Sequence, residues 1–382
     1  MRIRALFVTP KWGDGGGERT WLNLLAGLDR ERFEPSLAWF EKVDSHFLDE
    51  IPDDVRTYDL GKERRLALDL PRAVWALRTT LRAERPHVVL SLLHTWGFVL
   101  DAARTGIGFP VPVIANEHIH VDSSLAYLGG QRPLLSRAAP LLHRLAYRRA
   151  ARVVGVSEVQ MEDLRRRFHV PAEKTAVIPV GVDRERLRTR AAEELADTWY
   201  TERPLLLAVG RLIPQKAFDD LLHAFAVVAE RSDARLAILG EGELRPELER
   251  LVVALGLSER VRLPGLQENP YRYLGRAAAF VLSSRWEALP QVVIEALALG
   301  VPVVATDCPS GPRELLSDGH DGILVPPGDI GALAQELLRV LEDEPERERL
   351  AAASLARGGD FDVDAMVRAY ERELLRAASP AS

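Results

Sequence analysis

Two glutamates and two basic residues offer the clearest chemistry in the chain. Glu287 and Glu295 open and close the segment EALPQVVIE, and Arg211 and Lys216 stand in the segment GRLIPQK. A guanidinium can bind a diphosphate through two parallel hydrogen bonds, and an ammonium adds a point charge. Two carboxylates can accept hydrogen bonds from the hydroxyls of two sugar rings of one ligand. These residue types therefore suit a ligand that carries a diphosphate and sugar hydroxyls.

Each pair also has a simpler interpretation when it is taken alone. The two glutamates can be a capping residue and a solvated residue of one helix. The two cations can be solvated side chains beside a turn. A shared site is favoured because both pairs follow predicted strands of one series, where open α/β sheets bind their ligands.

A run of glycines after the first predicted strand gives a second candidate site. Gly16 and Gly17 lie in the sequence GGGERT, ahead of a helix that we expect to begin near Arg19. Glycine lets the backbone approach a phosphate or a sugar, and a helix N-terminus favours an anion. The run is also a degenerate dinucleotide fingerprint, with Thr20 in the place of the third glycine and Glu41 ending the second predicted strand. A dehydrogenase is therefore an alternative interpretation.

Histidines after two predicted strands are further candidates. His118 follows the predicted strand 111–115. His94 and His120 are weaker candidates of the same kind, and an ordinary loop histidine is the alternative for each of the three.

Loops in the second half of the chain complete the candidate site. Gly240 and Leu266 follow predicted strands, at places where a nucleotide base and ribose would rest in an open α/β fold. Simple turn chemistry is the alternative for both. Leu289 and Pro290 lead into a helix predicted over 291–299, and Pro290 suits the first turn of that helix. The unpaired backbone N–H groups at this helix start can bind hydroxyls or an anion.

The elements that must position these residues form two series of alternating strands and helices. Predicted strands of the first series are 3–8, 35–40, 55–58, 88–92, 111–115, 152–156 and 176–178, and those of the second are 204–209, 235–239, 261–263, 279–282 and 303–305. Predicted helices are 20–28, 70–84, 134–151, 218–230, 244–254, 291–299, 330–341 and 363–376. Uniformly apolar strands that alternate with helices indicate buried parallel sheets. We therefore predict an α/β protein with two doubly wound, Rossmann-like sheets.

The two series meet near Val182, which sets the predicted domain boundary. We expect an N-terminal domain over 1–182, a second domain over 183–360, and a C-terminal helical segment, 361–382, that crosses back onto the first domain. Two sheets that face each other would form an interdomain cleft. Ligands are then expected at the C-terminal ends of the strands.

The composition excludes several classes of protein. The chain has 382 residues and a net charge of −6, which argues against a general nucleic-acid binder. Its single cysteine, Cys308, excludes an intramolecular disulfide, and no Cys or His cluster has zinc-binding spacing. No apolar run is long enough to span a membrane, and the apolar N-terminal segment is too short for a secretory signal. We therefore expect a soluble cytoplasmic protein.

The segment from Glu287 to Glu295 resembles the E-x7-E signature of the family 4 retaining glycosyltransferases, which have the GT-B fold. Further segments that resemble motifs of this family are GGGE at 15–18, VIPVGVD at 177–183, GRLIPQK at 210–216, GPRE at 311–314 and GILVPPGD at 322–329. The resemblance runs from residue 3 to about residue 375. Val180 departs from the family pattern by replacing an asparagine, and Ala288 by replacing a glycine.

The resemblance implies transfer of a sugar from a nucleotide diphosphate donor, by default UDP-linked, to a hydroxyl acceptor with retained anomeric configuration. Arg211 and Lys216 would hold the diphosphate and stabilise its growing charge. Glu287 would grip the donor sugar, and Glu295 would hold the ribose hydroxyls.

The remaining implied roles concern the reacting face and the need for a metal. His118 and the backbone of Gly16 and Gly17 would shape the reacting face of the sugar. No Asp-x-Asp motif stands at a plausible diphosphate site, so we expect two cations to replace a divalent metal and no cofactor besides the donor. A nucleotide-sugar epimerase of the same fold, an NAD-dependent dehydrogenase and a non-catalytic donor-binding module remain alternatives.

An arginine-rich stretch bears on the acceptor. Residues 132–167 contain leucines interleaved with arginines. A basic, partly amphipathic helix can rest on an anionic membrane surface, which would suit a lipid-linked acceptor in polysaccharide, glycolipid or glycoconjugate biosynthesis. A solvated helix face is the alternative.

Overall fold

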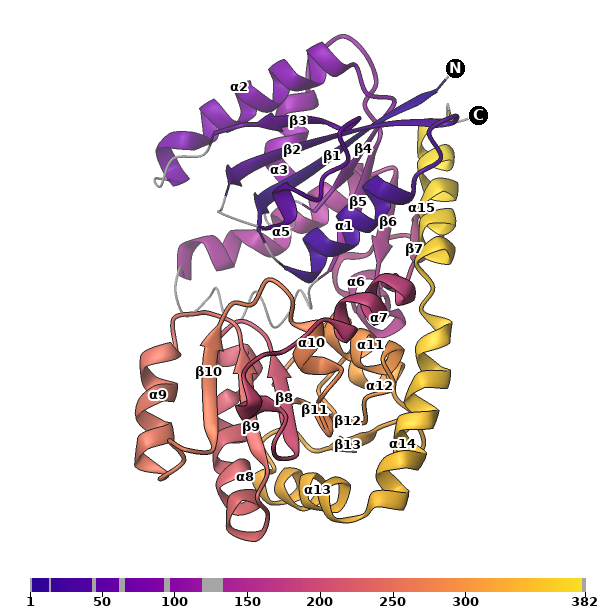
Figure 1. Ribbon diagram of the computed structural model, residues 1–382. Coiled ribbons are helices and arrows are strands. Elements are labelled where there is room, and N and C mark those ends of the chain that lie inside the picture. The colour runs from indigo at the N-terminus through magenta and orange to yellow at the C-terminus, as the bar shows by residue number, and fades with distance from the viewer. Residues whose placement is uncertain are drawn as a thin grey trace. The chain divides into compact units, whose positions relative to one another are not determined.

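The computed structural model of the protein (Figure 1) describes residues 2–13, 15–42, 46–61, 66–92, 97–118 and 133–379. The chain divides into two compact units. Unit 1 comprises Met1–Pro179 together with Val363–Ser382, and unit 2 comprises Val180–Asp362. His94 and His120 lie outside the described residues.

Unit 1 is built on a seven-stranded parallel sheet with the strand order β3-β2-β1-β4-β5-β6-β7. Its strands are β1 (Ile3–Trp12), β2 (Phe33–Lys42), β3 (Arg56–Asp59), β4 (Val88–Ser91), β5 (Val113–Glu117), β6 (Arg152–Gly155) and β7 (Thr175–Val177). Its helices are α1 (Gly16–Gly27), α2 (Leu66–Glu84), α3 (Gly97–Arg104), α5 (Pro133–Arg149), α6 (Glu158–Phe168) and α15 (Val363–Ala378). Every residue of β4 is buried, as expected for a central parallel strand with helices on both faces.

The strand order of this sheet reverses between β1 and β4. The chain runs outward through β2 and β3 and then returns to the other side of β1. Such a reversal opens a crevice at the C-terminal ends of the two central strands. α1 leaves β1 at this point and begins at Gly16, after Gly15 in extended backbone conformation. The predicted start near Arg19 is wrong because the glycines themselves form the first helical turn, although their sequence is typical of a loop.

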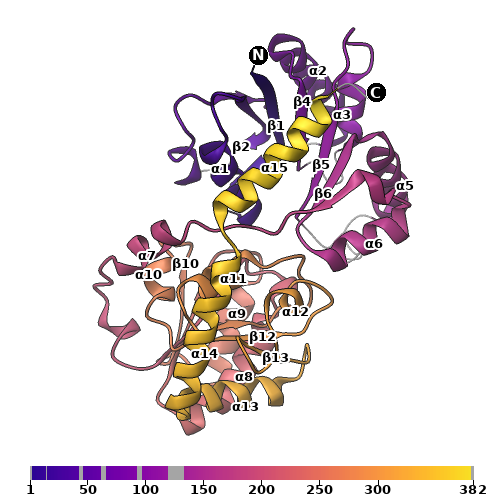
Figure 2. The same ribbon diagram turned by 90° about the vertical axis from the view of Figure 1, so that its right-hand side faces the viewer.

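The C-terminal helix α15 belongs to unit 1, where it packs against α1, β4 and β5 (Figure 2). Two contacts fix its position along the sheet. A side-chain oxygen of Glu371 accepts a hydrogen bond of 2.9 Å from the backbone N–H of Asp29. Glu373 pairs with Arg152 at 2.5 Å, and both side chains are largely buried. The register of α15 against unit 1 is therefore well determined.

Unit 2 contains a six-stranded parallel sheet with the order β10-β9-β8-β11-β12-β13. Its strands are β8 (Leu205–Val209), β9 (Arg235–Leu239), β10 (Val261–Gly265), β11 (Ala279–Leu282), β12 (Val303–Thr306) and β13 (Ile323–Val325). Its helices are α7 (Arg184–Ala192), α8 (Phe218–Arg231), α9 (Arg245–Ala254), α10 (Tyr271–Leu274), α11 (Gln291–Ala298), α12 (Pro312–Leu315), α13 (Ile330–Glu342) and α14 (Glu344–Arg357). Leucines and valines of the strands and of α8 and α13 form the main core. Here the strand order reverses between β8 and β11, so the loops after these two strands lie at the switch point.

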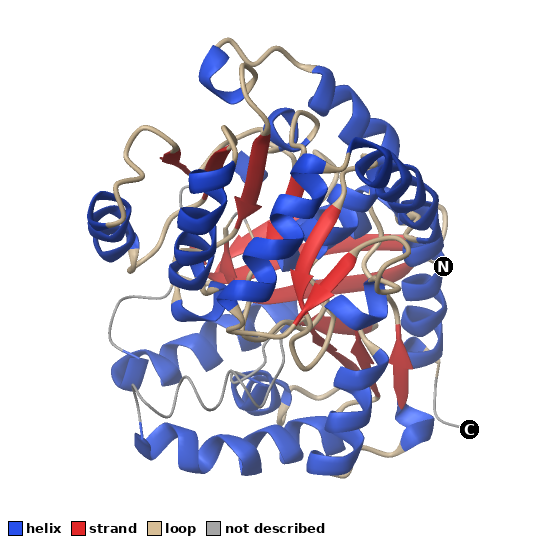
Figure 3. Cartoon of the chain, turned by 90° about the horizontal axis from the view of Figure 1, so that it is seen from below, coloured by secondary structure: helices blue, strands red, loops and turns tan. Residues whose placement is uncertain are grey.

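The predicted α/β fold with two Rossmann-like parallel sheets is confirmed, and helices flank the strands throughout (Figure 3). The sequence prediction did not include β13, a strand of three residues, or the helices α10, α12 and α14 of unit 2, and the helices that it named in unit 1 did not include α3 and α6. β13 is too short for a periodicity signal, and α14 begins with a charged stretch, EPERER, and has Leu350 and Leu355 as its only large apolar residues. None of the described helices combines the length and the apolarity needed to cross a bilayer.

Candidate functional site

The loop after β8 carries the two predicted cations. Lys216 ends a short 3-10 turn, Pro214–Lys216, and its backbone carbonyl accepts a hydrogen bond of 2.7 Å from the Ser283 hydroxyl. Ser283 directly follows β11, so this bond ties the two switch-point loops together. Arg211 lies at the start of the same loop with an exposed side chain, which forms no hydrogen bond or ion pair with any residue that the structure describes. The loop therefore carries Lys216, whose backbone is anchored to the neighbouring loop, and the exposed guanidinium of Arg211.

Glu287 is the centre of a compact polar network. Its Oε1 accepts a hydrogen bond of 2.6 Å from Lys216 Nζ and another of 2.7 Å from the Ser284 hydroxyl. Gln215 Nε2 lies 3.5 Å from Oε2 of the same carboxylate. Only 14% of the Lys216 side chain and 9% of the Glu287 side chain are exposed. An ion pair this dry is strong only while both partners are present, because either charge alone would be poorly solvated.

Hydrogen bonds of Arg285 and Gln215 connect the loops after β8 and β11. Arg285 donates to the carbonyl of Pro214 at 2.7 Å and to carboxylates of Asp219 and Asp220, each at 3.0 Å. The Gln215 side chain donates in the opposite direction, to the carbonyl of Trp286 at 2.8 Å. The backbone bond from the Arg285 N–H to the Gln215 carbonyl, 2.8 Å, adds a third link. These contacts hold Lys216 and Glu287 in register without a ligand.

Glu295 lies one turn into α11, and its carboxylate is held by neighbours. Its Oε1 accepts hydrogen bonds from Gln291 Nε2 at 3.0 Å and from the Tyr271 hydroxyl at 3.3 Å. Glu295 is 8% exposed. α11 begins at Gln291, where the predicted helix begins, and Pro290 is its N-cap residue rather than part of the first turn. Leu289, next to it, is half-buried.

The loops after β9 and β10 approach the loop after β8 closely. Gly240 has a φ of +137°, and a Cβ on it would lie 2.0 Å from the carbonyl oxygen of Gly210. Its N–H donates to the carbonyl of Gly265 at 2.9 Å. Only glycine fits this position, because any side chain would displace the loop that leads to the cations. Leu266 follows Gly265 and is 51% exposed, so it offers an apolar surface beside these loops.

The loop after β12 contacts the backbone of Glu287 and of its neighbour Ala288. The Ser310 hydroxyl donates to the carbonyl of Glu287. Gly311 packs against the same segment, since a Cβ on it would lie 2.7 Å from the carbonyl oxygen of Ala288. Burial and the nearby Glu287 carboxylate raise the pKa of the Cys308 thiol to about 12. Cys308 is therefore an uncharged packing residue here rather than a nucleophile.

The predicted residues of unit 1 follow β1 and β5, which lie on either side of β4 in the same sheet. Gly17 in the first turn of α1 is near Leu92 at the end of β4, with 3.7 Å between its would-be Cβ and Leu92 Cδ1. His118 follows β5, is half-buried, and has its Nε2 at 2.9 Å from Asn116 Nδ2. Gly16 begins α1. Gly16, Gly17 and His118 all belong to unit 1.

Several residues of these networks were not predicted from the sequence. They are Gln215, Tyr271, Ser284, Gln291 and Ser310 in unit 2, and in unit 1 Asn116 and Tyr370, whose hydroxyl donates to Asn116 Oδ1 at 2.9 Å. Gln291 had a usable signal, because it stands four positions before Glu295 on one predicted helix. The others had none that distinguishes them from ordinary polar residues.

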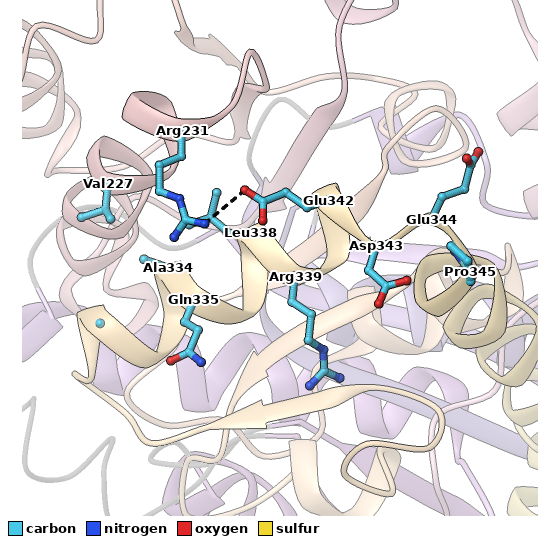
Figure 4. A pocket seen from close by; sticks show the side chains of 11 residues that line it. Val227, Arg231, Ala334, Gln335, Leu338, Arg339, Glu342, Asp343, Glu344 and Pro345 are labelled. Carbon is cyan, nitrogen blue, oxygen red and sulfur yellow. Dashed lines mark hydrogen bonds and ion pairs between the residues drawn. The ribbon is translucent and has the colours of Figure 1, made fainter.

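A pocket of unit 2 lies between α8, α13 and the start of α14 (Figure 4). Its volume is about 870 Å³, and Arg231 pairs with Glu342 at 3.4 Å across it. None of the described candidate residues lines this pocket, so it is separate from the candidate site. Within the described ranges, no group of three or more His, Cys, Asp and Glu side chains is arranged to hold a metal ion.

Comparison with known proteins identifies the family. Residues 14–186 match the family described as Glycosyltransferase Family 4, and residues 191–357 match Glycosyl transferases group 1. A Campylobacter jejuni protein is 30% identical over 372 residues, which cover 94% of this chain and 95% of that protein. It is named GalNAc-alpha-(1->4)-GalNAc-alpha-(1->3)-diNAcBac-PP-undecaprenol alpha-1,4-N-acetyl-D-galactosaminyltransferase. The chain therefore belongs to the family 4 glycosyltransferases.

Other relatives match over shorter segments. An uncharacterized glycosyltransferase of Methanocaldococcus jannaschii is 31% identical over 271 residues, which cover 62% of this chain and 66% of that protein. The chain spans between 52% and 66% of the length of this and three further curated relatives. Their names include enzymes of lipopolysaccharide core and undecaprenol-linked glycan synthesis.

Solved structures share the fold at low sequence identity. Anabaena HepE in complex with UDP-glucose aligns with a TM-score of 0.82 at 20% identity, over 98% of this chain and 100% of that chain. WaaG, a glycosyltransferase involved in lipopolysaccharide biosynthesis, aligns with a TM-score of 0.77 at 15% identity, over 97% and 99%. These similarities show the GT-B fold that the sequence resemblance implies.

Proposed function

We propose that the protein is a retaining glycosyltransferase that needs no divalent metal. It moves a hexosyl or N-acetylhexosaminyl group from a UDP-linked donor to a hydroxyl of a glycan, glycolipid or small metabolite. The observation that carries the proposal is the Lys216–Glu287 pair at the switch point of the unit 2 sheet, with the exposed Arg211 on the same loop as Lys216. The names of the Campylobacter relative and of the HepE complex with UDP-glucose are consistent with such a donor and acceptor.

The Lys216–Glu287 pair is the part of the site that changes when the donor binds. The diphosphate competes with Glu287 for the Lys216 ammonium, while the exposed Arg211 provides a second cation. A charge-assisted hydrogen bond of this kind contributes about 1.5–3 kcal/mol. Release from Lys216 leaves Glu287 Oε1 free to accept a hydroxyl of the donor sugar, with Ser284 still holding the carboxylate in place.

The nucleoside part of the donor is assigned to neighbouring loops. The Glu295 carboxylate accepts hydrogen bonds from the ribose hydroxyls. Its hydrogen bonds with Gln291 and Tyr271 already keep its side chain ordered, so little conformational entropy is lost on binding. The backbone around Gly240 and the apolar side chain of Leu266 flank the base. The N–H groups at the start of α11, just after Leu289 and Pro290, are donors for the sugar or the phosphate.

Retention of configuration follows from substitution on one face of the sugar. The departing phosphate oxygen takes the proton of the acceptor hydroxyl, so no protein nucleophile is required. The protein contributes position and electrostatic stabilisation, and Arg211 and Lys216 take the place of a metal on the leaving diphosphate. His118 and the backbone of Gly16 and Gly17 form the proposed acceptor-side group in unit 1.

A lipid-linked acceptor is favoured by the surface of α5. Leu141 and Leu145 are 62% and 40% exposed, and Arg144 and Arg148 are exposed between and beside them. An exposed apolar and basic helix face suits the headgroup region of an anionic membrane. Sedimentation with vesicles tests this: binding to phosphatidylglycerol vesicles should exceed binding to phosphatidylcholine vesicles, and the double variant L141E/L145E should lose it. Equal binding to both compositions would contradict a charge-dependent membrane contact.

A donor panel tests the proposed reaction. Nucleotide sugars are incubated with the full chain and simple glycosyl acceptors in the presence of EDTA, with UDP release as the first readout and the anomeric ¹H coupling of the product as the second. We expect transfer with retained configuration that E287Q abolishes and R339M, a change on the distant α13, leaves intact. Donor consumption with formation of an epimer and no acceptor product would favour an epimerase instead. An inverted product, or a strict need for added metal, would contradict the corresponding part of the proposal.

A further inference from the structure

A chain of three side chains links the C-terminal helix to His118. The Tyr370 hydroxyl of α15 lies 2.9 Å from Asn116 Oδ1, and Asn116 Nδ2 lies 2.9 Å from His118 Nε2. Asn116 is 0% exposed and Tyr370 is 1% exposed. Neither side chain takes part in the donor network of unit 2, and 254 residues separate the two along the sequence.

Burial determines which way the Asn116 amide points. If the amide were turned around, its NH₂ group would face the Tyr370 oxygen, and the phenolic proton would need another acceptor. The Tyr370 hydroxyl makes no other hydrogen bond to any residue in the described part of the chain. A buried donor without a partner is costly. The observed orientation, in which Tyr370 donates to Oδ1, is therefore the stable one.

This orientation fixes the protonation of the histidine ring. The amide NH₂ of Asn116 can only donate, so His118 Nε2 must accept and cannot carry a proton. A neutral ring then has its proton on Nδ1. A charged ring would direct an N–H from Nε2 against the N–H of the amide, so this contact disfavours the imidazolium.

We infer that Asn116 and Tyr370 are positioning residues, which hold His118 as a neutral donor with its proton on Nδ1. The inference concerns the state of the ring, while its value for catalysis rests on the function proposed above for His118. The anchored register of α15 supports it, because Glu371 and Glu373, which follow Tyr370 on the same helix, contact Asp29 and Arg152. α15 would then serve the reaction as well as the fold of unit 1.

The test is a direct measurement of the histidine tautomer in the full chain. The protein is labelled with ¹⁵N-histidine, and long-range ¹H–¹⁵N correlation spectra are recorded at neutral pH. H118Q identifies the signals of His118 among the nine histidines. We expect the wild-type ring to be protonated on Nδ1 alone. In N116D the new carboxylate accepts from Nε2–H, so the proton should move to Nε2.

The Y370F variant tests the outer end of the chain and has a matched control. Loss of the hydroxyl frees the Asn116 amide to turn, so both tautomers should appear and kcat should fall roughly tenfold with little change in KM. Tyr147 is equally buried and donates at 2.9 Å to Glu117, the residue next to His118. Y147F removes a comparable hydroxyl that does not belong to the Tyr370–Asn116–His118 series of hydrogen bonds, so it should leave the tautomer of His118 unchanged.

Each outcome bears on a separate statement. A wild-type His118 with its proton on Nε2, or an N116D variant with an unchanged tautomer, would overturn the inference. The same holds if Y147F and Y370F alter the tautomer alike. If the tautomer is as inferred while H118Q transfers sugar at the wild-type rate, the catalytic role proposed for His118 fails and the hydrogen-bond assignment stands.

Discussion

Replacing Lys216 by methionine separates the structural role of the ion pair from its role in donor binding. The variant keeps the aliphatic length and removes the charge that lies 2.6 Å from Glu287 Oε1. Removing one partner of a fully buried pair costs about 3–5 kcal/mol. Here the Glu287 carboxylate keeps the bond from Ser284 and some exposure, so we expect a loss of about 2–3 kcal/mol in unfolding free energy. Urea unfolding measures this loss.

The second variant, E287Q, removes the charge of the other partner in the ion pair. In the double variant K216M/E287Q no buried charge is left unpaired, so more than half of the lost stability should return. Affinity for UDP should not return, because the diphosphate has still lost its ammonium. Loss of one charge-assisted bond of about 1.5–3 kcal/mol corresponds to a roughly 10- to 150-fold weaker Kd.

Calorimetric titration with UDP in the presence of EDTA gives the comparison. K216M and the double variant should both bind UDP at least tenfold more weakly than wild type. E287Q alone should bind UDP as well as or better than wild type, since Lys216 no longer has an internal partner, while sugar transfer is lost. R339M, which removes an arginine from α13, is the control and should bind normally. If E287Q weakened UDP binding as much as K216M does, the competition between Glu287 and the diphosphate would be refuted.

Further predictions concern other parts of the chain. G240A should weaken UDP binding and destabilise unit 2 because its Cβ meets the Gly210 carbonyl, whereas G256A, also at positive φ but with open space around it, should cost only about 1 kcal/mol and leave UDP binding intact; equal effects on binding would contradict the loop contact. Ellman's reagent should modify native Cys308 roughly 1,000-fold more slowly than the unfolded chain, because its pKa of about 12 keeps the thiol protonated, and rapid native labelling would contradict this burial. Burial, with a nearby cation, lowers the pKa of His87 below its ordinary 6.5, so the unfolded state takes up this proton first as the pH falls. His87 should therefore favour folding above pH 6.5 and lose that contribution below it, and H87N should flatten the fall in unfolding free energy below about pH 6.5; an unchanged slope would contradict the shift.

The fold and the positions of the candidate residues at one sheet edge could be predicted from the sequence because both follow from simple rules. Uniformly apolar strands alternating with helices indicate parallel sheets, and loops after central strands meet at one sheet edge. Those rules bring Arg211, Lys216 and Glu287 to neighbouring loops. They do not determine side-chain partners, so the direct bond between Lys216 and Glu287 and the hydroxyl of Ser284 emerged only from the structure.

Long-range contacts mark the other limit of the sequence prediction. The pairing of Tyr370 with Asn116 joins residues 254 positions apart, and it depends on the register of a helix against a sheet. Neither residue stands in a motif that distinguishes it from ordinary core polar residues. The early start of α1 was missed for a different reason, because glycine has a low intrinsic preference for helix and the run at Gly16 is typical of a loop.

The central claim is that the switch-point loops of unit 2 bind the nucleoside diphosphate sugar. Hydrogen exchange of the full chain, measured by mass spectrometry with and without saturating UDP-sugar in EDTA, locates the ligand directly. We expect slower exchange in peptides that cover residues 210–217, 240–242, 265–266 and 283–295, and no change in peptides over 331–345, which line the pocket between α8 and α13. Protection confined to 331–345 would contradict the account, as would unchanged exchange in 210–217 and 283–295 for a UDP-sugar that the protein demonstrably consumes.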